Sequence, residues 1–578
     1  MSDHRPNPHR PEWAGAFYDA RDQMRAWVND SLRRNRPVPY HGGHDEGTFI
    51  SSWFGFHRLF GCPEAIDFAR HMRDGFSEWS REHLKHGFYP EGEAHHQTEI
   101  FTFFLCRLWR VAPDDETAEL IVDAAHHIGN WVEGFPRWYD PDECRFLSWR
   151  IGTESVGSGA QAGYEVPDHF RLLQMALVAR AITGEQRYLD LCTDYADRWA
   201  EAIINSPVDQ PPTIIRSGES EADREDVMSA VGAHHQGDSP LERVEPHVPA
   251  GTVDVLLDLY EITGEQRYAD ASRRICEALL PALTDPYSNP PGALLTRYRT
   301  ATGDRSLDEV ASERLRAGIQ ETLAGLDGML KFLKQTRVSG YALTAARLYA
   351  SLSDNPFAED LLEDYADRYE RLVGERPITG TRAETPALIV ETLNITPVAG
   401  IGKRRDMVRW GWESASGSLR QTFALPPPSL MAGYMIEGDE LLATRALQTV
   451  ATRMALASTS LRDGRDHGCA GSTIGAVASG HGRDGGYGNV TGAFFPLAAG
   501  MVRRLCQEEP LVRYRQSEDQ EYLPDSVAAL VRSLPAAGAE VLLWNDSDEP
   551  VSLEVALRNT PWRTVDLLPG AVTMLELP

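Results

Sequence analysis

Two almost identical stretches dominate the sequence. Ala-Ile-Thr-Gly-Glu-Gln-Arg-Tyr at 181–188 recurs as Glu-Ile-Thr-Gly-Glu-Gln-Arg-Tyr at 261–268, and each copy lies between two segments of helical periodicity. The glycine can adopt the left-handed conformation that ends a helix. The glutamate after it suits the positively polarised start of the next helix. The stretch therefore predicts a helical hairpin.

The two helices of such a hairpin differ in character. The segment 169–181 is apolar nearly all round, which is typical of a fully buried helix. The helix after the turn places Tyr188, Cys192, Tyr195 and Trp199 on one face, at spacings of three and four, and acidic residues on the other. This difference predicts an inner and an outer helix in a layered α/α array.

Weaker versions of the hairpin are expected along most of the chain, at 48–83, 98–134, 341–373 and 429–458. A first helix at 13–35 and an inner-type segment, Phe494–Cys506, remain without partners, and pairing them would close a ring. A further helix, Leu307–Lys334, is either an insertion or part of the ring. We therefore expect a mainly α fold, an (α/α)6 or (α/α)7 toroid over residues 1–510.

The pattern changes after Leu511. Residues 541–544, 551–556, 563–567 and 572–577 alternate like strands, with Asn545-Asp546 and Pro569-Gly570 as turns. Residues 511–578 are expected to form a small C-terminal β domain that caps one end of the ring.

Charge and cysteine content exclude some classes of function. The chain has 578 residues and a net charge of −28, which argues against nucleic acid or an anionic membrane as partner. There is no run of eighteen apolar residues, and the N-terminus has no apolar signal region. Seven cysteines without a CxxC pair favour reduced thiols and a cytoplasmic location. The oligomeric state is not predicted.

The hairpin turn, Thr-Gly-acid-x-Arg-Tyr, resembles that of the (α/α) toroid enzymes of carbohydrate metabolism. These include six-hairpin glycosidases such as the unsaturated glucuronyl hydrolases, the N-acylglucosamine 2-epimerases and the toroidal polysaccharide lyases. The resemblance covers about residues 13–506 and implies a carbohydrate-active enzyme. No catalytic signature of one family is matched, so no family's catalytic residues are carried over.

In such a ring the loops that lead into the inner helices converge on one mouth, and histidines gather in these loops. Histidine can act as an acid, a base or a metal ligand near neutral pH. Each one alone can also be explained as a solvated or capping group. The histidine candidates for catalysis are His44, His95, His96 and His169.

Carboxylates in the same loops form the second group of candidates. Glycoside hydrolysis needs a proton donor and a base or nucleophile. Asp45 and Asp168 can also be explained as helix N-caps, and Glu91 and Glu93 as solvated loop carboxylates. The catalytic candidates of this kind are Asp45, Glu99, Glu154 and Asp168, and Tyr487 completes the catalytic set.

Aromatic and basic loop residues suggest the substrate. Sugars stack on aromatic rings, and arginine forks pair with carboxylates, so an acidic sugar such as a uronate is indicated. Buried packing and surface salt bridges are the competing explanations. The substrate-binding candidates are Arg150, Tyr164, His247, Arg337, Trp410, Trp412 and Arg483.

No cofactor is expected. Metal ligation by these histidines is possible chemically, but no HxxxH or CxxC spacing supports it. The Gly-rich loop 464–492 lacks the phosphate-binding pattern of nucleotide sites and fits a lid instead.

We therefore expect a glycoside hydrolase that acts on an oligosaccharide by carboxylate and histidine acid–base catalysis. In one version of this hypothesis the oligosaccharide contains a uronate. A lyase is the first alternative, with His or Tyr as base and Arg or His neutralising the uronate. A sugar epimerase is the second. A helical-repeat binding scaffold is the non-enzymatic alternative.

Overall fold

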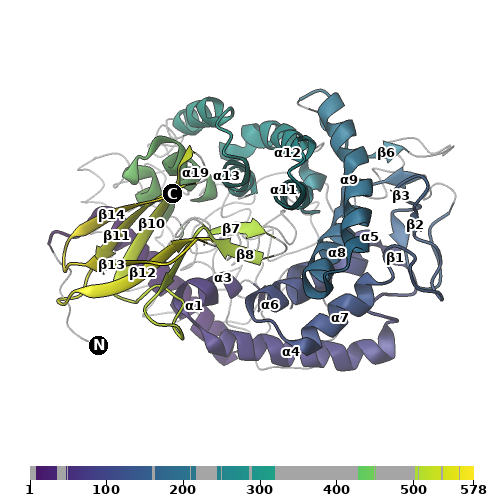
Figure 1. Cartoon of the computed structure of the whole chain (residues 1–578), viewed down its shortest axis with the longest axis horizontal. Helices are drawn as coiled ribbons and strands as arrows, with labels where there is room; N and C mark the ends of the chain where they lie inside the picture. Colours follow the sequence, from purple (N-terminus) through teal and green to yellow (C-terminus); the bar gives the residue numbers. More distant parts are fainter. Residues whose placement is uncertain are drawn as a thin grey trace, which may run out of the picture.

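The computed structural model describes residues 8–34, 47, 50–51, 53–158, 163–208, 210–216, 244–248, 250–284, 290–318, 427–447, 450, 501–504, 507–535, 538–558 and 560–578. These residues form helical hairpins that follow one another around an arc, with a β module beside its two ends (Figure 1). The expected mainly α architecture with C-terminal strands is confirmed. The choice between six and seven hairpins stays a prediction, since parts of the chain lie outside the described residues.

The helices alternate between an inner and an outer layer. Residues Phe170 to Ala179 of the inner helix α8 are all buried, whereas the outer helix α9 buries one face and exposes the other. Inner helices contact the next inner helices along the arc, α5 to α8, α8 to α11, α11 to α13 and α13 to α19 (Figure 1). The hairpin helices are α3 (Phe54–Phe60), α4 (Pro63–His83), α5 (Ala94–Ile100), α6 (Cys106–Val111), α7 (Asp115–Ala125), α8 (Phe170–Thr183), α9 (Gln186–Asn205), α11 (Thr252–Thr263), α12 (Gln266–Leu279), α13 (Pro290–Thr302), 308–318, α19 (Pro427–Glu437) and 440–447.

The repeated turn is built from side-chain hydrogen bonds and a left-handed glycine. The Thr183 hydroxyl donates to the Ala179 carbonyl at 2.9 Å and accepts from the Glu185 N–H at 3.1 Å. Gly184 has a φ of 76°, and Gly264 of the second copy has the same value. A third copy, Thr302-Gly303-Asp304, makes the same bonds after α13. The turn is therefore a device that stops one helix and starts the next.

Replacing Gly264 by Ala should lower the free energy of unfolding by about 1 kcal/mol, because a Cβ is strained at positive φ. No atom lies within 4 Å of the added Cβ, so the cost is one of backbone conformation alone. Urea unfolding would measure it. Gly264→Asn should cost less, because Asn tolerates this conformation. Equal losses for Ala and Asn would contradict this explanation.

The C-terminal strands form two three-stranded antiparallel sheets. The orders are β10-β11-β14 and β13-β12-β9. Strand β10 contacts α1 (Glu12–Arg34) and α19, and the Tyr18 hydroxyl of α1 donates to the Ser526 carbonyl at 2.7 Å. The module thus joins the first helix to a late one (Figure 1). Its strands are β9 (Val512–Arg515), β10 (Val527–Ser533), β11 (Ala539–Asn545), β12 (Val551–Leu557), β13 (Arg563–Leu567) and β14 (Val572–Leu577).

Two expectations from sequence differ from the structure. The prediction of an inner-type helix at Phe494–Cys506 is wrong for its last part. Met501–Arg504 is strand β7, which pairs with β8 (Gln507–Pro510). A short apolar run does not distinguish a buried strand from a buried helix. Helix α13 has no counterpart among the expected hairpins, although it contacts α11, α12 and α19 as an inner helix. The expected hairpin 341–373 lies outside the described residues.

Among the described residues, no helix is both long enough and apolar enough to cross a membrane.

Candidate active site

The candidate site lies at the N-terminal end of helix α5, next to a short two-stranded antiparallel ribbon. Strand β1 (Gly92–Glu93) pairs with β4 (Arg150–Ile151), so that Glu93 lies opposite Arg150. The Ala94 N–H donates to the Trp149 carbonyl at 2.9 Å, which fixes the first turn of α5 against the ribbon. The ribbon therefore determines where the polar residues of this turn point.

The first two turns of α5 carry two histidines in contact with carboxylates. The rings of His95 and His96 have centroids 3.8 Å apart. A Glu93 carboxylate oxygen lies 3.4 Å from Nδ1 of His95 and 3.8 Å from Nε2 of His96. Nδ1 of His96 lies 3.4 Å from the carboxylate of Glu99, one turn further along.

A second segment completes the site from the start of α8. Asp168 lies in the 3-10 turn Pro167–His169, and Arg171 follows in the first turn of the helix. The Arg171 guanidinium is 3.7 Å from Glu99 through Nη1 and 3.7 Å from Asp168 through Nε. It also lies over the Phe103 ring, 4.7 Å from the centroid. One buried cation is thus shared by two carboxylates from different hairpins.

We call this set of six residues the His95 cluster: Glu93, His95, His96, Glu99, Asp168 and Arg171. Its inner members are buried, with Arg171 1 % exposed and His95 4 % exposed. His96 and Glu93 lie closer to solvent, and Arg150 reaches Glu91 at 3.0 Å and Glu93 at 3.6 Å at the rim. The cluster is therefore a polar path from the surface into the core.

Electrostatics keep His95 neutral. Burial lowers the pKa of His95 to about 3, and the positive charge of Arg171 acts in the same direction against the opposing carboxylates of Asp168 and Glu99. A neutral imidazole at neutral pH can accept a proton or orient a neighbour, but it cannot donate the proton of an imidazolium. Glu93, His95 and His96 also offer donor atoms within 4.8 Å of one another, a spacing that could hold a divalent ion.

The structure brings His95, His96, Glu99 and Asp168 together and places Arg150 at the rim. The expected location of His95 and His96 is wrong, since they lie on helix α5, which begins at Ala94, and not in the loop before an inner helix. Asp168 lies one residue before the N-cap of α8, which is His169, so the alternative N-cap position differs from the structure by one residue.

Other candidates lie elsewhere in the described structure. His169 is buried, its Nε2 donating to the Ser148 carbonyl at 3.0 Å and its Nδ1 lying 3.0 Å from the Tyr195 hydroxyl. His247 is buried in the same way, between the Pro212 carbonyl at 2.8 Å and the Thr252 hydroxyl at 3.2 Å. Tyr164 is buried in β5 (Tyr164–Glu165), and the side chain of Glu154 is exposed. These two histidines therefore support packing, and we leave all four residues out of the site.

Seven predicted residues lie outside the described residues, and their placement stays a prediction. They are His44, Asp45, Arg337, Trp410, Trp412, Arg483 and Tyr487.

Sequence reasoning missed Arg171 and undervalued Glu93. Arg171 belongs to the segment 169–181, which was interpreted only as a buried apolar helix. That interpretation could have pointed to Arg171, because a charged side chain on a helix buried all round needs a partner of opposite charge. Glu93 is largely buried against both histidines and is not a solvated loop carboxylate.

The buried His247 gives a pH prediction. Burial lowers its pKa to about 4, whereas in the unfolded chain it protonates near the ordinary value of 6.5. Its stabilising contribution is therefore present above pH 6.5 and is lost as the pH falls toward 4. Between pH 5 and 6 the free energy of unfolding should rise with pH. His247→Gln should reduce the slope of that rise by about 1.4 kcal/mol per pH unit.

Urea unfolding at several pH values would measure this slope, which a constant loss of stability in the variant does not alter. The exposed His71→Gln variant is the matched control. A slope unchanged from that of the original protein would contradict the assignment of His247 as a buried neutral group.

Comparison with known proteins gives fold-level likenesses only. No protein-family model and no curated protein matches the chain. A solved unsaturated glucuronyl hydrolase from Bacillus sp. GL1, described as responsible for the degradation of glycosaminoglycan, has 13% identity and a TM-score of 0.34, covering 51% of this chain and 78% of that one. An unsaturated glucuronyl hydrolase specific for heparin has 9% identity and a TM-score of 0.37, covering 50% and 80%. At these scores the likeness assigns no activity, and the function below is argued from the site.

Proposed function

We propose that the His95 cluster is the acid–base centre of an enzyme that hydrolyses a glycosidic bond in an oligosaccharide. The observation that carries this proposal is the pair of buried carboxylates, Glu99 and Asp168, that share the guanidinium of Arg171. Glycoside hydrolysis uses two carboxyl groups, one protonated and one ionised.

The charges around Arg171 favour one protonated and one ionised carboxyl group. One guanidinium balances one carboxylate, and a second ionised carboxylate in a buried site is costly. Since His95 stays neutral, the compensating proton belongs on a carboxyl group. Glu99 contacts both Arg171 and His96, which favours its ionised form. We therefore assign Asp168 as the acid and Glu99 as the base or nucleophile.

The separation of the two groups fits the same chemistry. Each carboxylate oxygen lies 3.7 Å from a nitrogen of one planar guanidinium. The two oxygens are therefore at most about 10 Å apart, an upper limit that permits the separations of about 5–9.5 Å that glycosidases use. His95 and His96 would orient the carboxylates and bind sugar hydroxyls.

The arginines bear on the lyase alternative. Elimination next to a uronate needs a cation that is available to the substrate carboxylate. Arg171 is buried and already contacts two carboxylates, so it does not supply that cation. Arg150, with a side chain 25 % exposed at the rim, is the residue we assign to a uronate carboxylate.

The test is incubation of the full-length protein with neutral and uronate-containing oligosaccharides. New reducing ends without absorbance in the unsaturated-sugar band are the expected result. New absorbance in that band would mean elimination, and a changed sugar without new reducing ends would mean epimerisation. Either outcome, or no reaction with any oligosaccharide, would overturn the proposal.

A further inference from the structure

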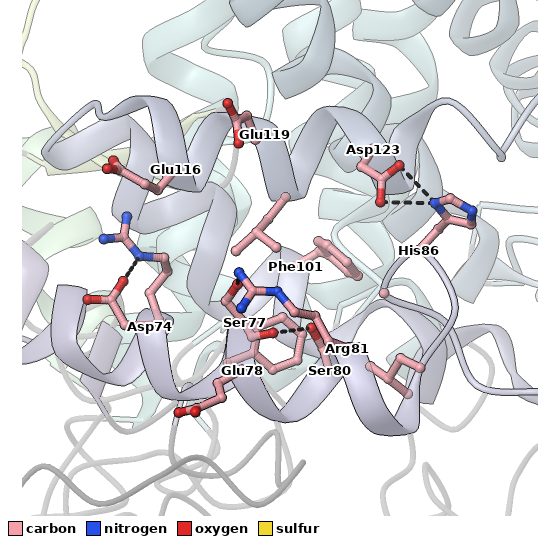
Figure 2. A pocket seen from close by; sticks show the side chains of 15 residues that line it. Asp74, Ser77, Glu78, Ser80, Arg81, His86, Phe101, Glu116, Glu119 and Asp123 are labelled. Atoms are coloured by element: carbon pink, nitrogen blue, oxygen red, sulfur yellow. Dashed lines mark hydrogen bonds and ion pairs between the residues drawn. The ribbon is translucent and has the colours of Figure 1, made fainter.

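A second cluster of histidine and carboxylate lies away from the His95 cluster, at one end of a surface groove between two outer helices. The groove has a volume of about 660 Å³ and runs between α4 and α7, with Phe101 at its floor (Figure 2). Five acids and two arginines line it, so that its lining attracts cations. The acids are Asp74, Glu78, Glu116, Glu119 and Asp123.

His86 and Asp123 meet at the end of this groove (Figure 2). Nδ1 of His86 lies 2.9 Å and 3.1 Å from the two carboxylate oxygens of Asp123. The contact already holds an imidazole nitrogen and a carboxylate at a separation close to that of two ligands of one ion.

His127 completes the group from the turn after α7. Its Nδ1 lies 2.8 Å from the Asp123 carbonyl and must donate to it, so Nε2 carries the lone pair. The ring is held between His86 and Phe135, with centroid distances of 4.2 Å to each. The ring of His127 is therefore held in one orientation, with a defined tautomer.

The backbone holds His86 in a conformation that side chains rarely adopt. His86 and Gly87 have φ values of 52° and 83° in the turn that joins Lys85 to Phe88. A residue with a Cβ costs about 1 kcal/mol there, and the most suitable residue for such a turn is Asn or Gly. The turn thus holds an imidazole at a backbone position that disfavours it.

We propose that His86, Asp123 and His127 bind a divalent transition-metal ion of the Zn²⁺ class. Their donor atoms lie within 4.8 Å of one another. A tetrahedral ion with bonds of about 2.0–2.2 Å spaces its ligands about 3.3 Å apart, so small side-chain movements are enough. Two imidazoles and one carboxylate suit Zn²⁺, Co²⁺ and Ni²⁺ better than Mg²⁺ or Ca²⁺. The fourth position is open to water or to a ligand lying in the groove.

The experiment is titration of the full-length protein, freed of metal with a chelator, with Zn²⁺ in a calorimeter. His86→Asn and Asp123→Asn should weaken one equivalent of binding by at least about tenfold. Asn tolerates positive φ, so the first variant keeps the turn. The matched control is His126→Asn, next to His127 but outside the cluster, and it should bind Zn²⁺ as the original protein does.

Co²⁺ provides a second readout. Binding at this site should give the visible absorption of a four-coordinate Co²⁺ ion, and His86→Asn should abolish it. The proposal is overturned if the original protein binds neither ion, if His86→Asn binds as well as the original, or if His126→Asn loses binding equally.

Discussion

Replacing Asp168 by Asn should lower kcat for oligosaccharide hydrolysis by about 10²–10⁴-fold, the usual contribution of a general acid. The amide cannot deliver a proton to the leaving oxygen, whereas its shape and burial match those of the carboxyl group. Glu99→Gln should have an effect of the same order. Release of reducing ends would measure both.

The fold should survive both changes. Each one leaves a single carboxylate next to Arg171, so the buried charges remain balanced. Circular dichroism and urea unfolding would check this. Asp548→Asn, an exposed change in the β module, is the control and should retain full activity. If Asp168→Asn and Glu99→Gln both keep their activity, the catalytic centre lies elsewhere.

The second large effect is expected from Arg171→Met, which should lower the free energy of unfolding by about 3–5 kcal/mol. Arg171 is 1 % exposed and contacts Glu99 and Asp168, and its removal leaves the ionised carboxylate of this buried pair without its cation. Urea unfolding would measure the loss. In a background that carries both Glu99→Gln and Asp168→Asn, the cost of the same change should fall sharply, because no buried charge is then left behind.

A matched control exists in another inner helix. Arg297 of α13 is fully buried and contacts Asp258 at 2.9 Å and Glu261 at 2.8 Å. Arg297→Met should also destabilise the protein, yet activity per folded molecule should be retained. A loss below about 1 kcal/mol for Arg171→Met would show that the guanidinium does not balance a buried ionised carboxylate.

The hairpins were predictable because their signals are local. Thr183-Gly184 and Thr263-Gly264 end helices through bonds within a few residues, and the apolar spacing on either side distinguishes a buried helix from a half-exposed one. Strands β11 to β14 follow from alternation in the same way, whereas β9 and β10 were not predicted. Prediction failed at Met501–Arg504, where a short apolar run fits either a strand or a helix.

The site was predictable only in part. His95, His96, Glu99 and Asp168 were selected by residue type, and the structure places them in one cluster. The same criterion also selected His169 and His247, whose ring nitrogens both have partners within the core. Residue type does not reveal whether an imidazole has such partners, because the partners come from other segments of the chain.

The sequence by itself therefore determined the repeated hairpins, the difference between their inner and outer helices and four strands of the C-terminal module, since each depends on neighbours a few positions away. Only the tertiary structure decided which polar groups meet. Glu99 and Asp168 belong to different hairpins, and the packing of α5 against α8 brings them to the two sides of Arg171. A distance between side chains of different hairpins depends on that packing, and no local periodicity encodes it.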